Sequence, residues 1–198
     1  MAVVILTIAL GFVARFLAGA IWGHDPQSLE SPISGQYFRI SDIVIGVPEI
    51  WIIGITIFLT VVLFVFFAKT KLGVAMQAAS QNQMAAYYMG IPVRRVNSLI
   101  WALSGIVAAI AGILFASKNA IDPGTGLLGI KAFAAAVIGG LGSLPGALLG
   151  GLVIGLIEPF AARYLEGDIA RIMPYLVLVL ILIFRPHGIL SQVQKKKV

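Results

Sequence analysis

The chain contains no cysteine, only two histidines and few charged residues. The absence of cysteine excludes disulfide frameworks, thiol catalysis and cysteine-based zinc sites. The histidines, His24 and His187, lie far apart in polar segments, so a histidine metal cluster is not expected. We therefore predict that the chain has no metal site and no cofactor of its own.

Charged residues make up 11% of the 198 residues and hydrophobic residues 60%, and the mean hydropathy is +1.02. Soluble domains average about 25% charged and 45–50% apolar residues. This composition excludes a disordered tail and a small soluble enzyme. The net charge of +6 does not indicate nucleic-acid binding, because the basic residues form no extended stripe with interleaved aromatic residues. The sequence is typical of an integral membrane protein surrounded by lipid.

Four apolar stretches are long enough, or nearly so, to cross a bilayer as helices, which takes about 20 residues. They cover residues 2–22, 50–68, 97–117 and 169–184. A fifth apolar region, residues 132–160, is longer, but several glycines and a proline interrupt it. Its relation to the membrane depends on the orientation of the other spans.

The basic residues indicate that orientation. Residues 69–96 and 185–198 together hold eight of the 14 basic residues and none of the eight acidic residues. Residues 23–49 carry four acidic residues and one arginine. Because positively charged loops stay in the cytoplasm, both basic segments are predicted to be cytoplasmic and residues 23–49 to lie outside.

The number of membrane crossings then indicates how the fifth region, residues 132–160, enters the membrane. The span at 97–117 runs outward, and the last span must run inward if the basic tail is cytoplasmic. Residues 161–171 then lie outside, so residues 132–160 must enter and leave the membrane by the same face. We predict a re-entrant hairpin of two helices with a turn near mid-depth. One continuous, kinked span is the alternative, and it would leave the tail lysines outside.

The predicted fold is therefore all-α: a polytopic transmembrane helical bundle with a re-entrant, broken Gly-rich helix hairpin, forming one domain over residues 1–198. At the break stand Gly139, Gly140, Gly142, Ser143, Pro145 and Gly146. Broken membrane helices expose backbone groups that bind solutes or ions, which makes these residues a candidate translocation path. Close helix packing is the other interpretation, because Gly146/Gly150 and Gly151/Gly155 have the spacing that lets backbones touch.

The cytoplasmic segment Gly73–Gly90 is rich in helix-forming residues and bounded by glycines. It predicts one or two short helices at the membrane surface. Two roles are compatible with this pattern, a membrane-surface anchor and a docking element for a cytoplasmic partner.

The chain shows no sign of enzyme chemistry. It has no G-x-x-x-x-G-K-[ST] motif, so any ATPase that drives transport is a separate chain. Gly124, Gly126 and Gly129 match G-x-G-x-x-G by chance, because no strand precedes them. Arg15, inside the first span, either extends toward the interface or faces the bundle interior, where charges tend to be functional.

Three blocks of sequence resemble a known family. They are KLGVAMQAASQNQMAAYYMGI (71–91), KAFAAAVIGGLGSLPGALLGGLVIGLIE (131–158) and FRPHGIL (184–190). Their order and spacing are similar to those of the permease subunits of branched-chain amino acid ABC importers, the LivH/LivM type. The chain looks like the C-terminal two-thirds of such a permease, which would make it a fragment, a truncated reading frame or a reduced relative.

The resemblance implies a transport subunit of the cell inner membrane, not an enzyme. Its implied partners are two cytoplasmic ABC ATPase subunits, a second permease subunit and an extracytoplasmic solute-binding protein. The family's cytoplasmic loop couples to the ATPase, which places this role on residues 69–96. The residues that match the family pattern there are Gly73, Ala78, Asn82, Ala86, Gly90 and Ile91. The family usually has basic residues soon after the first glycine, where this chain has Val74 and Gln77.

Several other functions remain open at this stage. An ABC permease for urea, an amide or a sugar also fits the sequence, because no side chain selects among these solutes. A stand-alone channel would use residues 139–146 as its filter. A structural membrane subunit without a path of its own is a further alternative.

Overall fold

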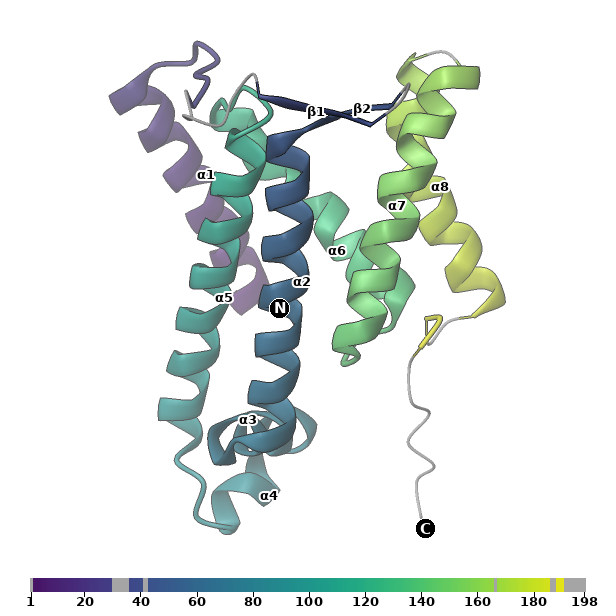
Figure 1. Cartoon of the computed structure of the whole chain (residues 1–198). Coiled ribbons are helices and arrows are strands. Elements are labelled where there is room, and N and C mark those ends of the chain that lie inside the picture. The colour runs from purple at the N-terminus through teal and green to yellow at the C-terminus, as the bar shows by residue number, and fades with distance from the viewer. Residues whose placement is uncertain (1, 30–35, 41–42, 166, 186–187, 191–198) are drawn as a thin grey trace. The chain divides into compact units, whose positions relative to one another are not determined.

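Residues 2–29, 36–40, 43–165, 167–185 and 188–190 are described by a computed structural model (Figure 1). The described chain is mainly helical, which confirms the predicted all-α membrane fold. The long helices are α1 (Ala2–Trp22), α2 (Val47–Lys69), α5 (Val93–Ala116), α7 (Leu144–Tyr164) and α8 (Gly167–Phe184). The shorter ones are α3 (Lys71–Gln81), α4 (Gln83–Tyr88), α6 (Leu128–Gly139) and the 3-10 helix η1 (Pro123–Leu127).

Each predicted apolar span coincides with a helix, but helices α2, α5 and α8 begin two to four residues earlier than predicted. By length and composition, four helices in the described part of the chain can cross a membrane: α1, α2, α5 and α7. The stretch Ile172–Phe184 of α8 is a shorter apolar segment. The predicted cytoplasmic tail falls mostly outside the described residues, as do His187 and Glu30.

The sequence analysis missed one element, a small antiparallel sheet. Strands β1 (Tyr37–Ile40) and β2 (Ile43–Gly46) pair with Phe38 opposite Ile45 and Arg39 opposite Val44. The second strand leads directly into α2, whose first turn contains Pro48. Proline fits there because the first helical residues lack backbone hydrogen-bond partners within the helix.

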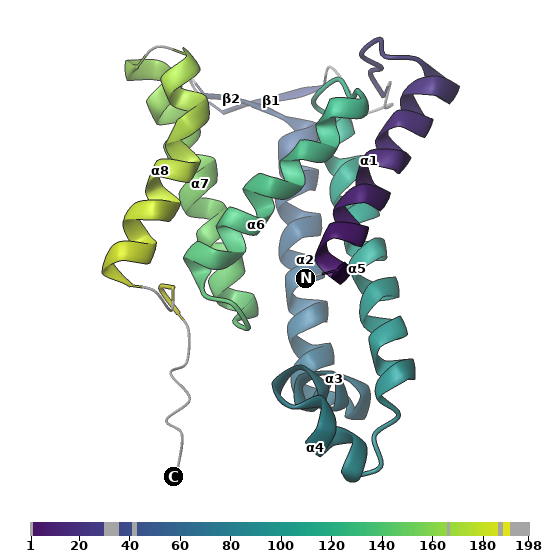
Figure 2. The same cartoon turned by 180° about the vertical axis from the view of Figure 1, so that it is seen from behind.

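The chain forms two compact units, one of residues 22–122 and one of residues 1–21 with 123–198. In the first unit, α3 and α4 cover the end of α2 and the start of α5 (Figure 1). The buried core there consists of Met76, Ala79, Ala86 and Val96. In the second unit, α6, α7 and α8 pack side by side (Figures 1 and 2). Their shared core consists of Ala134, Ala135, Ile138 and Ile154.

Candidate functional site

The loop that the charges predict to be cytoplasmic is folded as two helices, α3 and α4, where the sequence predicted one or two. Thr70 forms the junction between α2 and α3. Its hydroxyl donates a hydrogen bond to Phe66 O (2.7 Å) and accepts one from Gly73 N (2.9 Å). The hydroxyl thus pairs an amide at the start of α3 that the helix leaves without a partner. It also gives Phe66 O, which already accepts from Thr70 N (3.1 Å), a second hydrogen bond.

Asn82 separates α3 from α4. Its backbone is extended, and its side-chain Oδ1 accepts a hydrogen bond from Ala85 N (3.0 Å). An asparagine in this position satisfies one of the first unpaired amides of the following helix, which is why it is favoured as an N-cap. Gly90 ends the segment with φ +79°, a conformation that favours glycine.

The residues that match the family pattern mostly build the interior of this loop. Gly73 is buried, and a Cβ there would lie less than 3.0 Å from the backbone of α2 at Phe66 and Phe67. Ala86 is 4% exposed, and Ile91 packs on the same core. Ala78 is half-buried. These residues determine the shape of the loop, because each fills or closes a contact inside it.

The outward surface of α4 consists of residues that the sequence analysis did not single out. Met84, Tyr87, Tyr88 and Met89 are 62%, 67%, 76% and 82% exposed. The signal was present in the sequence, because positions 84, 87 and 88 share one face of a helix. We call these four residues the α4 surface.

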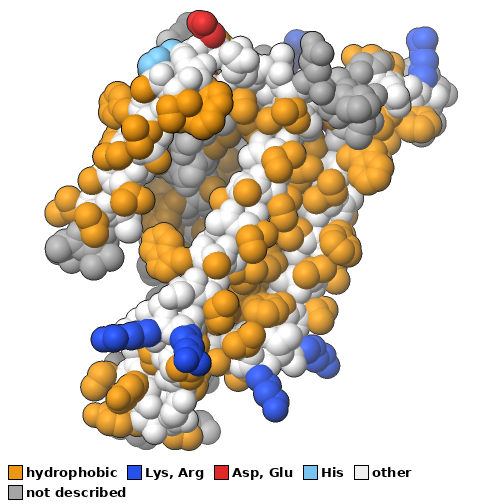
Figure 3. All heavy atoms as spheres, turned by 90° about the vertical axis from the view of Figure 1, so that its left-hand side faces the viewer, with side chains coloured by type: hydrophobic (Ala, Val, Ile, Leu, Met, Phe, Trp, Pro, Cys, Tyr) orange, Lys and Arg blue, Asp and Glu red, His pale blue; other side chains and the backbone are white. Residues whose placement is uncertain are grey.

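Basic side chains surround this part of the unit. Lys69, Lys71, Arg94 and Arg95 are exposed at the ends of α2, α3 and α5. Figure 3 shows Lys and Arg side chains at the lower end of the view, and hydrophobic side chains over the long helices above them. The loop therefore presents exposed tyrosine and methionine side chains next to positive charge.

We expect Asn82→Ala to loosen α4, because the substitution removes its N-cap at a cost of about 1 kcal/mol. Amide hydrogen exchange at residues 85–88 should accelerate roughly fivefold, as about 1 kcal/mol of lost local stability implies. Asn82→Asp keeps the capping oxygen and should exchange like the natural protein. Equal exchange in Asn82→Ala would show that the cap does not hold α4.

The second candidate site, the helix break, lies between α6 and α7. The two helices form an antiparallel hairpin that approaches backbone to backbone. A Cβ at Gly139 would lie less than 3.0 Å from the backbone of Gly146. A Cβ at Gly146 would likewise lie less than 3.0 Å from the backbone of Gly139. A Cβ at Gly150 would meet Ala135 O in the same way. Only glycine at positions 139, 146 and 150 permits the two helix backbones to approach this closely.

The turn itself spans residues 140–143. Gly140 and Gly142 have φ +107° and +91°, which L side chains rarely adopt. Ser143 caps α7 by accepting a hydrogen bond from Gly146 N (3.1 Å), and Pro145 occupies the first turn of that helix. Of the six residues predicted for the break, Gly140, Gly142 and Ser143 lie in the turn, Gly139 ends α6, and Pro145 and Gly146 lie in the first turn of α7.

Residues that follow α8 close the end of α6. Ile189 N donates to Ile138 O (2.9 Å), and Leu190 N donates to Gly139 O (3.0 Å). Gly188, with φ +80°, lies so near Gly140 that a Cβ would come within 3.0 Å of it. The second and third family-like blocks therefore meet, although 25 residues (159–183) separate them in sequence.

At the other end of the hairpin, Lys131 on α6 forms an ion pair with Glu158 on α7. The Nζ–Oε1 distance is 2.5 Å, and the two side chains are 29% and 34% exposed. The sequence analysis did not predict this contact, because nothing local indicates that these two residues face each other. The pair joins the open ends of the two helices.

Of the two interpretations of the glycines, close packing describes Gly139, Gly146 and Gly150. Gly151 and Gly155 differ, because no described atom lies within 4 Å of a Cβ placed there. The carbonyls of Ile138 and Gly139 are also paired within the chain. The last two carbonyls of α6 are therefore occupied by amides of the segment that follows α8.

Alanine at neighbouring helical glycines should have opposite effects. Gly150→Ala forces α6 and α7 apart and should cost about 1–3 kcal/mol, the usual penalty of overpacking. Gly151→Ala meets no described neighbour and should stabilise α7 by about 0.5–1 kcal/mol, because alanine is the better helix former. Thermal unfolding of the two purified variants, each in the same detergent, measures the difference. Equal destabilisation by both variants would contradict the close contact at Gly150.

This arrangement, long apolar helices with a closed helix hairpin, defines a polytopic helical membrane protein. A family profile described as the permease component of branched-chain amino acid transport systems matches residues 1–182. The chain belongs to this family.

Curated relatives agree with the profile. The branched-chain amino acid permease protein BraD of Pseudomonas aeruginosa is 35% identical over 80% of this chain and 52% of its own length. LivH of Escherichia coli K12 is 35% identical over 75% of this chain and 48% of its own. The fructose import permease protein FruG of Bifidobacterium longum is 31% identical over 81% of this chain and 51% of its own.

The chain thus spans about half the length of the curated relatives it matches. No solved structure matches it significantly.

Proposed function

We propose that this chain is the membrane-spanning permease subunit of an ATP-driven importer for branched-chain or related small amino acids. The observation that carries the proposal is the α4 surface: exposed tyrosine and methionine side chains on a short helix whose opposite face is packed into a core. Exposed aromatic and methionine side chains are the kind that anchor protein interfaces.

The partner proposed for this surface is a separate cytoplasmic ABC ATPase. The loop helices would fit into a groove of that ATPase, with the α4 surface in the apolar floor and the surrounding lysine and arginine side chains facing acidic residues. ATP binding by the partner would then move α3 and α4 as one body. Gly73 and Thr70 support this transmission, because they join α3 closely to the end of α2.

The proposed assembly also contains a second permease subunit and a solute-binding protein outside the cell membrane. The orientation is the one predicted from the charges, with residues 69–96 and 185–198 in the cytoplasm and residues 132–160 re-entrant. Helix α6 has 12 residues, so it extends about 18 Å, which is less than the hydrocarbon thickness of about 30 Å. The contact of residues 188–190 with the end of α6 supports a turn nearer the cytoplasmic face than mid-depth.

The solute class rests on the relatives. The names of BraD and LivH specify transport of branched-chain amino acids. A sugar or another small solute is the second candidate, because a fructose permease is also similar over most of this chain. A stand-alone channel with residues 139–146 as its filter is disfavoured, because the carbonyls of Ile138 and Gly139 already accept hydrogen bonds from the chain.

Crosslinking from the α4 surface tests the coupling role. The chain lacks cysteine, so Tyr88→Cys introduces one site for a photoreactive maleimide. In native membranes we expect it to capture a P-loop ATPase, identified by mass spectrometry. Ala79→Cys is the matched control, because Ala79 is 1% exposed and faces the loop core. A fully labelled Tyr88→Cys that captures no ATPase would refute the proposed coupling.

A further inference from the structure

The 22–122 unit contains a cavity that neither candidate site includes. It lies at the ends of α2 and α5 that are opposite to the loop helices, and its volume is about 430 Å³. Small-molecule sites in proteins usually measure about 300–1,000 Å³. The cavity is therefore large enough for a small organic molecule.

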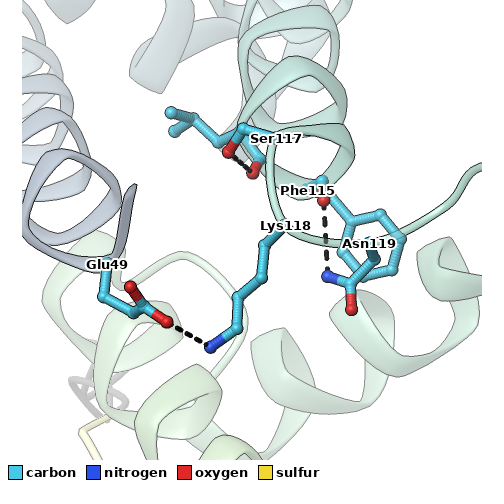
Figure 4. Close-up of polar contacts among 6 residues, drawn as sticks. Glu49, Phe115, Ser117, Lys118 and Asn119 are labelled. Atoms are coloured by element: carbon cyan, nitrogen blue, oxygen red, sulfur yellow. Dashed lines mark hydrogen bonds and ion pairs between the residues drawn. The ribbon is translucent and has the colours of Figure 1, made fainter. Parts of the chain in front are cut away.

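One acidic and one basic side chain stand side by side in its wall. Glu49, in the first turn of α2, and Lys118, just after α5, form an ion pair with an Oε1–Nζ distance of 2.9 Å (Figure 4). Their side chains are 36% and 53% exposed, so solvent reaches both charges. The nearby Ser117 and Asn119 side chains donate to carbonyls of α5. These bonds fix the backbone that positions Lys118.

The rest of the wall has an apolar part, to which Leu29, Tyr37, Pro48 and Ala116 contribute. Uncharged polar residues, Ser28 and Gln36 among them, complete it. The cavity thus combines one negative group, one positive group and an apolar surface. A small molecule with an ammonium, a carboxylate and a hydrocarbon side chain has the complementary pattern.

We propose that this cavity binds an apolar amino acid as its zwitterion, with the ammonium on Glu49 and the carboxylate on Lys118. Such a ligand inserts between the two side chains and replaces one ion pair by two. An exposed ion pair contributes little net stability, so opening it costs the protein little. Each new contact is a charge-assisted hydrogen bond, which is stronger than a neutral one.

The inference rests on the proposed function and deepens it. The residues that line the cavity lie at positions 28–29, 36–37, 46, 48–49 and 116–120, in or next to the parts of the chain predicted to lie outside. The site would receive the solute on that side, at the far ends of the helices that carry the loop. It adds a solute contact in the 22–122 unit, apart from the α6–α7 turn.

Three ligands that differ only in charge test the site. L-leucine carries both charges, isoamylamine only the ammonium, and 4-methylpentanoate only the carboxylate. Saturation-transfer NMR on the purified chain in nanodiscs, with empty nanodiscs subtracted, measures their dissociation constants. We expect leucine to bind roughly tenfold more tightly than either analogue, as a second charge-assisted contact implies. Equal binding of all three would overturn the proposal without the use of any variant.

Two variants, each with one charged side chain replaced by an uncharged one, show which side chain binds the ammonium and which binds the carboxylate. Glu49→Gln should weaken leucine and isoamylamine roughly tenfold and leave 4-methylpentanoate unchanged. Lys118→Gln should weaken leucine and 4-methylpentanoate and leave isoamylamine unchanged. Asp25→Asn and Arg163→Gln remove the same charges from other exposed positions and should change none of the three constants. Loss of leucine binding in these controls as well would indicate a general charge effect and contradict the site.

The outcome is separable from that of the coupling experiment. Capture of an ATPase from Tyr88→Cys without charge-selective leucine binding would remove this cavity site and leave the permease role intact. Charge-selective binding without ATPase capture would keep the site and remove the coupling mechanism.

Discussion

The structure depends on one constraint: where a helix ends, its first backbone N–H groups and last C=O groups have no partner within the helix and must be paired by other groups. Three helix ends of this chain show how the constraint is met. Thr70 pairs groups at the end of α2 and the start of α3, and Asn82 caps α4. At the end of α6, the amides of Ile189 and Leu190 pair with carbonyls of the preceding hairpin. The glycines at these breaks allow the close distances that the pairing needs.

This constraint gives the residues that match the family pattern a structural role. Gly73, Ala86 and Ile91 lie against the core of the loop, and Gly139 and Gly146 lie against each other. Their identity is explained by packing before any contact with a partner is considered. The α4 surface and the cavity at Glu49 and Lys118 are the parts of the 22–122 unit for which we propose contacts with other molecules. The residues that determine the local packing are thus different from the residues that form the proposed contact surfaces.

Local pattern was sufficient to predict the long helices, the break at residues 139–146 and short helices in the loop, because apolar runs and glycines act over a few residues. It did not identify Asn82 as the cap that divides the loop into two helices. It was not sufficient for contacts between distant segments. The pairing of Ile189 with Ile138 and of Lys131 with Glu158 depends on how helices pack, which no single segment encodes. The two short strands were missed because each has only four residues, too few for a clear alternating pattern. For the glycines, the sequence left packing and solute binding open, and only the backbone distances separate Gly150 from Gly151.

The central claim of this account is that the closed α6–α7 hairpin enters and leaves the membrane by one face, opposite to the loop helices. Labelling of single cysteines with a membrane-impermeant maleimide tests it most directly. Tyr164 at the end of α7 is 80% exposed and Tyr88 on α4 is 76% exposed, so both positions accept a probe. The account predicts that Tyr164→Cys is labelled in intact cells from which any outer membrane or wall has been removed, and Tyr88→Cys only after permeabilisation. Labelling of both residues from the same side would contradict it.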